Sequence, residues 1–397
     1  MLIWLAPLLV FGLVVFVPEL GHFLAAKAVG VYAPRFSIGF GPSLWRRRWG
    51  ETEYVLALLP LGGYVRMASN QDQATAFLEG GSEESGVSEV GANAAAPTIK
   101  GEEGTRDWDP NAMKPFGPKP IPDHRWFESK PLLARLFILI AGVTMNVVLT
   151  ATLETGRIAA YGRTRTRPVA DSIVPGRPAE RAGLLKGDSI VAVDGMPLTD
   201  WSRLVARVGA SAGRSLTFEI VRSGERRTLT ITPELTTEED PRTGKTEQVA
   251  RIGVRPKAER VGVSAGQAIR GGLESTWLLA GGIVEIVRGL FSGAVSTSQL
   301  GGPIAIAEAS VQAARGGLET FMWLIAFLSV NVAVINLLPV PILDGGQILL
   351  NVLEAAKGSA FSARTREYIL RVGLVAIALL FALVMFNDIK GIVLRIL

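Results

Sequence analysis

The sequence predicts a polytopic α-helical membrane protein with about four spans, a membrane-associated β-region and one outward-facing α+β domain. Hydrophobic residues make up 48% of the 397 residues and charged residues only 19%, and the mean hydropathy is +0.32. Such a composition is too apolar for an ordinary soluble enzyme. A helix that crosses a bilayer needs roughly 20 apolar residues. Four long apolar runs meet or approach this length: residues 2–26, 132–153, 321–335 and 369–386, of which the third is short.

The first run predicts a retained span rather than a secretory signal, because it lacks a basic n-region and a small-residue cleavage site. The chain contains no cysteine, which excludes disulfides and thiolate metal sites. Its two histidines are His22 and His124. A net charge of +5, with basic residues near the span ends, suits a membrane protein and does not indicate nucleic-acid binding.

The region between the first two spans divides into two parts. Residues 31–68 alternate apolar and polar positions and contain a Gly-Gly turn, which predicts a small curved sheet close to the membrane. Two pairs of short strands are expected to flank the sequence "RRRWGE". Residues 69–130 are rich in Gly, Ser, Glu and Ala, so they predict a flexible cytoplasmic insertion.

A soluble domain is predicted at residues 163–257, where short β-rich runs alternate with Gly and Asp turns. Helices are expected near 178–182 and 201–208. In the following segment, 258–319, an apolar stretch carries four charges, and burying each in a membrane costs about 2.5–3.5 kcal/mol. An amphipathic helix at the membrane interface is therefore favoured over a fifth span.

The short loops fix the expected orientation. Arginine and lysine residues follow span one, precede span two and separate spans three and four. Positive loops stay in the cytoplasm, so the 163–257 domain faces outward and both termini lie on one side. We therefore expect this domain on the outer side of the membrane.

Three polar residues within apolar surroundings are candidates for chemistry. Glu19 lies in span one, where an ionised carboxylate is expensive and therefore a functional candidate. His22 follows three residues later, on the same helix face. Asp344 lies in "NLLPVPILDGGQ", residues 336–347, where two prolines and an Asp-Gly-Gly turn predict irregular backbone at membrane depth.

These segments resemble a known family. "PELGH", residues 18–22, looks like the His-Glu-x-x-His helix of zinc metalloproteases. The segment 336–345 resembles the partner motif of site-2-protease-type intramembrane metalloproteases. The β-region, "ILIAGVTMN" at 138–146 and "LGGPIAIAEAS" at 300–310 are also similar to this family, and the soluble domain to a PDZ domain. The bacterial regulator-of-sigma-E protease subgroup is the best match, and the likeness covers nearly the whole chain.

The resemblance implies a zinc endopeptidase that hydrolyses transmembrane segments, such as those of anti-sigma factors, after another protease has trimmed them. By correspondence, His22 and Asp344 match Zn²⁺ ligands and Glu19 matches the general base. Asn336 would position the substrate backbone within a loop shaped by Pro339 and Pro341. The sheet at Gly62 and Gly63 would pair with an unwound substrate strand. The PDZ-like domain would act as a filter, although the sequence does not place its ligand groove.

The sequence departs from this family at position 18, where proline stands in place of the first histidine. Proline offers no ligand, which leaves two protein ligands against the three of catalytic zinc sites. It also removes a backbone hydrogen bond in the helix. His124 and Gln347 are poor substitutes, the first in a surface loop and the second a weak ligand. One base change converts a histidine codon to proline, so natural loss, engineered loss and sequence error remain open.

Three functions therefore stand. The first is an intramembrane zinc protease whose activity in this form is limited by Pro18. The second is a pseudoprotease that binds membrane segments or peptides without cutting them. The third, a transporter that uses Glu19 and Asp344 in an ion path, is weaker because the sequence has no inverted repeat of broken helices.

Overall fold

A computed structural model describes residues 2–69, 123–239 and 246–396, in two compact units. We call residues 1–153 and 301–397 the helical unit and residues 154–300 the β-rich unit. Most of the predicted insertion at 69–130 lies outside the described residues. Its last part is described and packs into the helical unit, where Phe127 is buried beside Ala26 and Ile138.

Among the described residues, four helices are long and apolar enough to cross a membrane, which agrees with the four spans that the sequence predicts. The first runs through Leu2–Leu5 (η1) and Ala6–Ala28 (α1) and continues through Pro18 without a break. The others are α3 (Leu132–Tyr161), α8 (Leu318–Asn336) and α10 (Ala363–Ile396). Helix α8 has 19 residues, so the third span is longer than its apolar run and reaches spanning length.

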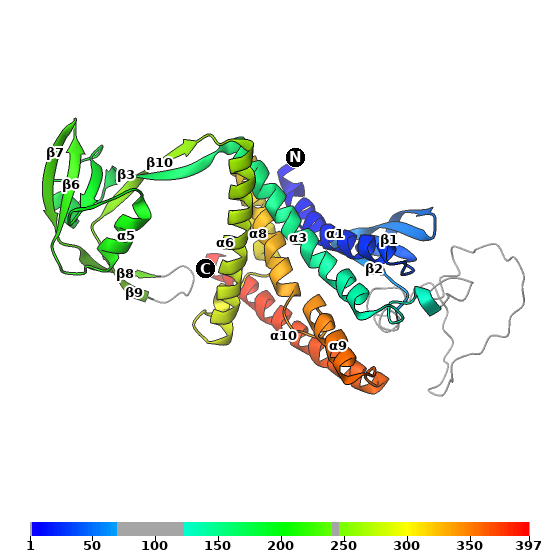
Figure 1. The fold of residues 1–397 in the computed structure, drawn as a ribbon. Helices are drawn as coiled ribbons and strands as arrows, with labels where there is room; N and C mark the ends of the chain where they lie inside the picture. Colours follow the sequence, from blue (N-terminus) through cyan, green and yellow to red (C-terminus); the bar gives the residue numbers. More distant parts are fainter. Residues whose placement is uncertain (1, 70–122, 240–245, 397) are drawn as a thin grey trace, which may run out of the picture. The chain divides into compact units, whose positions relative to one another are not determined.

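The predicted β-region forms a bent sheet beside α1 (Figure 1). It consists of two long strands, β1 (Arg35–Trp49) and β2 (Thr52–Arg66), and not of two pairs of short strands. Gly39 and Gly41 have positive φ angles of 92° and 85°, which let β1 bend instead of ending. Phe36 pairs with both Tyr54 and Val65, so the first part of β1 lies between two parts of β2.

The helical unit contains two further helices, α7 and α9. Helix α7 (Pro303–Arg315) begins against Asp388 of α10, whose carboxylate accepts hydrogen bonds from the backbone N–H groups of Gly302 and Ile304.

Helix α9 (Asp344–Lys357) corrects the expectation of an Asp-Gly-Gly turn, because Asp344 is the first residue of this helix. A carboxylate in the first turn is favoured by the helix dipole. The short helix η2 (Asp123–Arg125) precedes α3.

The β-rich unit is built on a mixed-length sheet with strand order β10-β3-β4-β6-β7, and β5 pairs with β4. Its core contains Phe218, Ile190, Leu204 and Leu216, all almost fully buried. The last strand extends to Val261, beyond the predicted boundary at 257. The elements are β3 (Arg163–Ile173), α4 (Pro178–Arg181), β4 (Ser189–Val193), β5 (Met196–Pro197), α5 (Trp201–Gly209), β6 (Leu216–Arg222), β7 (Glu225–Ile231), β8 (Glu234–Glu239), β9 (Thr246–Arg251), β10 (Val254–Val261), α6 (Ala265–Phe291) and η3 (Thr297–Gln299).

Helix α6 occupies the amphipathic stretch predicted from the sequence. A capping box formed by Ser264 and Gln267 fixes its start. Large apolar side chains, including Trp277, Leu278 and Phe291, remain exposed along it. The helix is not among those apolar enough to span a membrane, in keeping with the charges that it carries.

Candidate metal centre

The fold brings His22 and Asp344 together from opposite ends of the chain. His22 Nε2 lies 3.4 Å from Asp344 Oδ2, and the two side chains are only 12% and 17% exposed. Asp344 Oδ2 is buried and has no hydrogen-bond partner within the described ranges. An acceptor oxygen buried without a partner is costly. This oxygen and the facing imidazole nitrogen are therefore close enough together for both to contact one metal ion.

His22 is oriented by the backbone of α3. Its Nδ1 lies 2.9 Å from the carbonyl oxygen of Ile138, and because a carbonyl only accepts, Nδ1 carries the proton. Nε2 is then the nitrogen that faces Asp344, and in the neutral imidazole it is the one whose lone pair a metal could use. A side chain on Gly142 would collide with the His22 ring. The absence of a Cβ at Gly142 thus leaves room for the Nε2 edge of the imidazole beside α3.

Asp344 is held in place by the close packing of the first turn of α9. A Cβ on Gly345 would collide with the carbonyl of Leu337, and a Cβ on Gly346 with that of Val340. Both glycines are buried. They are required because the preceding loop folds tightly against the helix, and not because the chain turns there.

A partly buried polar network links α9 to α3. Arg135 Nη1 donates to Asn351 Oδ1 at 2.7 Å, and Asn351 Nδ2 donates to the backbone oxygen of Gln347 at 2.8 Å. Gln347 Nε2 in turn donates to the carbonyl of Pro341 at 2.7 Å. The network therefore fixes α9 relative to the helix that orients His22.

Glu19 and the sheet edge lie next to each other. A Cβ placed on Gly63 would come within 3.6 Å of Glu19 Cγ and would collide with the backbone oxygen of Ser37. Gly62 is buried against the ring of Phe40. The two glycines keep the end of β2 thin, so its backbone lies close to the glutamate.

The motif after α8 forms a short connection to α9. Asn336 is the last residue of α8 and is half-buried. Pro339 is exposed, whereas Pro341 packs against α10 at Gly373. His124 lies exposed in η2 and is not placed as a ligand.

The residues present do not complete a catalytic zinc site. Position 18, one helical turn before His22, holds a buried proline with no ligand atom. His22 and Asp344 supply two ligands, and catalytic zinc requires three from the protein. Among the described residues, no group of three His, Cys, Asp or Glu side chains could hold a metal.

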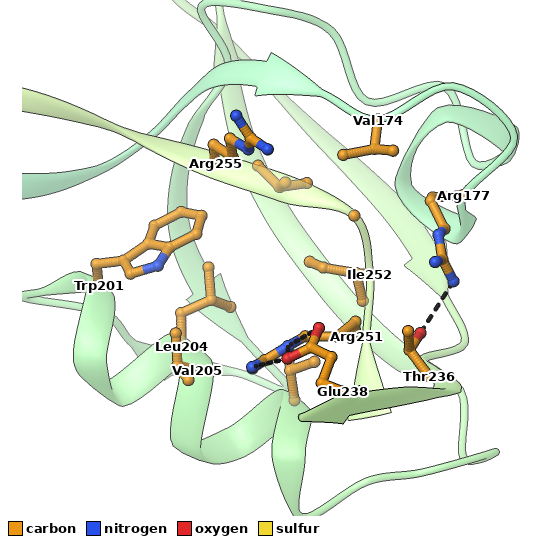
Figure 2. Close-up of a pocket in the computed structure, with 13 residues that line it drawn as sticks. Val174, Arg177, Trp201, Leu204, Val205, Thr236, Glu238, Arg251, Ile252 and Arg255 are labelled. Atoms are coloured by element: carbon orange, nitrogen blue, oxygen red, sulfur yellow. Dashed lines mark hydrogen bonds and ion pairs between the residues drawn. The ribbon is translucent and has the colours of Figure 1, made fainter. Parts of the chain in front are cut away.

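The β-rich unit contains a separate groove with a cavity of about 380 Å³ (Figure 2). One wall is the apolar face of α5, including Trp201, Leu204 and Val205, and the other is the segment around Ile252 at the start of β10. Strand β10 ends the order of its sheet, so its outer edge has no strand partner within the described residues. Such an edge beside an apolar groove can accept an extended peptide.

Charged groups close one end of this groove. Arg251 and Glu238 form an ion pair at 2.7 Å. The hydrogen bond from Arg251 lowers the pKa of Glu238 below its ordinary value, against the smaller opposing effect of burial. Arg177 Nη1 donates to Thr236 Oγ1 at 2.9 Å. The ion pair thus joins β8 to β9 within the hairpin, and the hydrogen bond from Arg177 ties the hairpin to another part of the groove lining (Figure 2).

Several residues that shape the site were not predicted from the sequence. The Ile138 carbonyl is a backbone atom, so no residue type could indicate it. Gly142 lies in the small-residue part of "ILIAGVTMN" and could have been suspected from its lack of a side chain. Arg135 and Asn351 are separated by most of the chain, and only the fold joins them.

Sequence comparisons find relatives along nearly the whole chain. The zinc metalloprotease RasP of Geobacillus kaustophilus is 32% identical, over 96% of each chain. The regulator of sigma-E protease RseP of Escherichia coli is 31% identical, over 95% of this chain and 96% of its own. The RseP of Salmonella typhimurium is 30% identical over the same shares. The model of Peptidase family M50 matches residues 6–380. The chain therefore belongs to peptidase family M50, the site-2 protease family.

Proposed function

We propose that this chain has the architecture of an intramembrane zinc endopeptidase and that Pro18 strongly reduces its hydrolytic activity in the form given. The substrates are the transmembrane segments of single-span proteins, such as anti-sigma factors, after a first cut by another protease. The observation that carries the proposal is the buried pair of His22 and Asp344, with Nε2 and Oδ2 3.4 Å apart. Membership of peptidase family M50 supports it.

The remaining site residues have distinct roles in this proposal. Glu19 takes a proton from the attacking water as the general base. The thin end of β2 at Gly62 and Gly63 pairs with an unwound stretch of substrate beside Glu19. Asn336, with the loop of Pro339 and Pro341, positions the substrate backbone.

Restoring the missing ligand tests the proposal. We expect the Pro18→His chain, purified in detergent, to bind one zinc ion and to cleave a membrane-anchored substrate, while the Pro18 chain does neither efficiently. Pro18→His with Glu19→Gln is the matched control, since it keeps the ligands and lacks the base. It should bind zinc without cleaving. A histidine form that neither binds zinc nor cleaves would show that the enzyme assignment is wrong.

The β-rich unit is proposed to contain a PDZ-like domain that faces the periplasm of a bacterial inner membrane. It would admit trimmed substrates and exclude those with large outer domains. The apolar groove between α5 and β10 supports a role in holding peptide ends.

A second candidate function is a pseudoprotease that binds membrane segments without cutting them. The observation that favours it is Pro18 itself, which removes a ligand while leaving the sheet edge and Glu19 in place. A photo-crosslinking side chain at Tyr64 should then capture single-span proteins in the Pro18 chain, with no cleavage product. If the Pro18 chain captures none and the histidine form does, binding without cutting is excluded.

A further inference from the structure

The outer half of β1 presents an exposed run of aromatic and basic side chains that the proposed function does not use. Every residue from Gly41 to Gly50 is exposed. Trp45 and Trp49 have 53% and 81% of their surfaces open to solvent. Between them lie Arg46, Arg47 and Arg48. An exposed tryptophan pair of this kind is unfavourable in water and typical of a membrane interface.

The arginines of this run differ from neighbouring basic residues in their partners. Arg35 pairs with Glu53 at 2.8 Å, and Lys27 and Arg125 both pair with Glu51, at 2.6 and 2.8 Å. Arg46 and Arg47 have no carboxylate partner within the part of the chain that the structure describes. Two adjacent positive charges thus project from the strand without a carboxylate partner among the described residues.

The position of the strand end relative to span one sets its depth. Glu51, at the turn between β1 and β2, is bound to Lys27 in the last turn of α1. That turn is the end of a helix long enough to cross a membrane. The turn between the strands therefore lies at the level where the first span leaves the bilayer core, which is the level of the lipid headgroups.

Side chains alternate along β1, so one face of the strand end combines Trp45, Arg47 and Trp49. Leu56, 42% exposed, pairs with Trp45 across the strands and joins that face. Arg46 and Arg48 lie on the other face. Tryptophan rings prefer the boundary of the acyl chains, and arginine binds phosphate through paired N–H donors. One strand end thus offers groups for both parts of a phospholipid.

We propose that the strand end from Trp45 to Trp49 binds the anionic phospholipid headgroups of the bilayer that surrounds the protein. The arginine charges attract the anionic headgroups, and the two indole rings fix how deeply the strand end lies in the membrane interface. Binding there fixes the sheet at the membrane surface, independently of any proteolytic activity.

The full chain offers a clean test because it has no cysteine. Ser43→Cys, beside the tryptophan-arginine run, carries a polarity-sensitive fluorophore, and the protein is placed in nanodiscs of phosphatidylcholine with or without phosphatidylglycerol. We expect a blue-shifted emission only with phosphatidylglycerol, and its reversal in high salt, which screens exposed charges. Arg46→Gln with Arg47→Gln should abolish the shift, with a roughly fivefold loss of lipid affinity for each charge removed.

Arg226→Gln with Arg227→Gln is the matched control, because it removes the same charge from an exposed hairpin of the β-rich unit. It should leave the shift unchanged. Equal emission in neutral and anionic nanodiscs would overturn the proposal. If the double variant folds poorly, the labelled chain with its arginines intact still tests the proposal, through the effect of lipid charge and of high salt on its emission. A shift that depends on the acidic residues of the 79–109 segment, and not on lipid charge, would also overturn it.

Discussion

The His22 imidazole is positioned by α3 and needs no metal to hold its orientation. The Ile138 carbonyl accepts its Nδ1 proton, and Gly142 leaves room for the ring. When a histidine binds a metal, losing the hydrogen bond to its other ring nitrogen typically lowers metal affinity by about 10- to 100-fold. In the proposed site, His22 would therefore need little rearrangement to bind a metal ion.

This arrangement predicts the effect of Gly142→Ala. In the Pro18→His background, the added methyl group should displace the imidazole and lower zinc affinity by about 10- to 100-fold. Zinc titration of the purified protein measures this. Gly12→Ala is the control, because a Cβ there meets nothing within 4 Å. Equal zinc affinity in the two variants would contradict the proposed contact.

Glu51 predicts a pH dependence of the β1–β2 turn. Hydrogen bonds from Arg125, and more weakly from Lys27, outweigh burial and lower the pKa of Glu51 from 4.5 to about 2. Because the folded-state pKa is the lower one, the stabilisation is fully present above pH 4.5 and is lost as the pH falls toward 2.

Glu51→Gln should therefore weaken amide protection at the start of β2 at neutral pH. The difference from the unchanged chain should shrink as the pH falls from about 4.5 to about 2. Hydrogen exchange, expressed as protection factors, measures both. Glu225→Gln, in the exposed pair with Arg227, should have little effect at any pH. A difference that persists undiminished at low pH would exclude the ion pairs as its cause.

At the scale of elements, α7 depends on a carboxylate from another helix. Asp388 is buried and accepts hydrogen bonds from the N–H groups of Gly302, Ile304 and Ala305, at 2.8 to 3.2 Å. These donors at a helix start would otherwise lack partners. The carboxylate of Asp388 in α10 thus caps the start of α7, in addition to the proline at its first position.

Asp388→Ala should lower the free energy of unfolding by about 1–2 kcal/mol and increase exchange at Ile304 and Ala305. Asp388→Asn should lose less, since its amide oxygen still accepts hydrogen bonds. Thermal unfolding in detergent and hydrogen exchange provide the two measurements. If both variants match the unchanged chain, the cap does not stabilise α7.

The sequence predicted the spans better than the elements around the site, and the physical reason is clear. A bilayer forces an apolar length on each span, which residue type alone reveals. The bend of β1 at Gly39 and the start of α9 at Asp344 depend instead on tertiary contacts. His22 and Asp344 were predicted from motifs, whereas the Ile138 carbonyl and the partnership of Arg135 with Asn351 arise only when distant segments pack.

At the scale of the whole molecule, the chain enters and leaves the large sheet of the β-rich unit at neighbouring points. Arg163, at the start of β3, pairs with Val261 at the end of β10. The intervening residues can therefore be removed without changing the distance that the remaining chain must bridge.

We predict that replacing residues 164–260 by a short glycine linker in the Pro18→His chain leaves zinc binding intact. The proposed filter would be gone, so untrimmed and trimmed substrates should be cleaved at similar rates. A cleavage assay with the two substrate lengths measures this ratio, and Glu19→Gln in the deleted chain is the blank. A preference for trimmed substrate as strong as that of the full chain would place the filter elsewhere.

The pairing of Arg163 with Val261 also bears on how such proteins change over evolutionary time. Because the two strand ends are adjacent, a recombination event can insert, exchange or duplicate a folded domain between them. The rest of the protein then keeps its structure. Selection on what a relative recognises can then proceed in that domain alone, without touching the residues that line its catalytic interior.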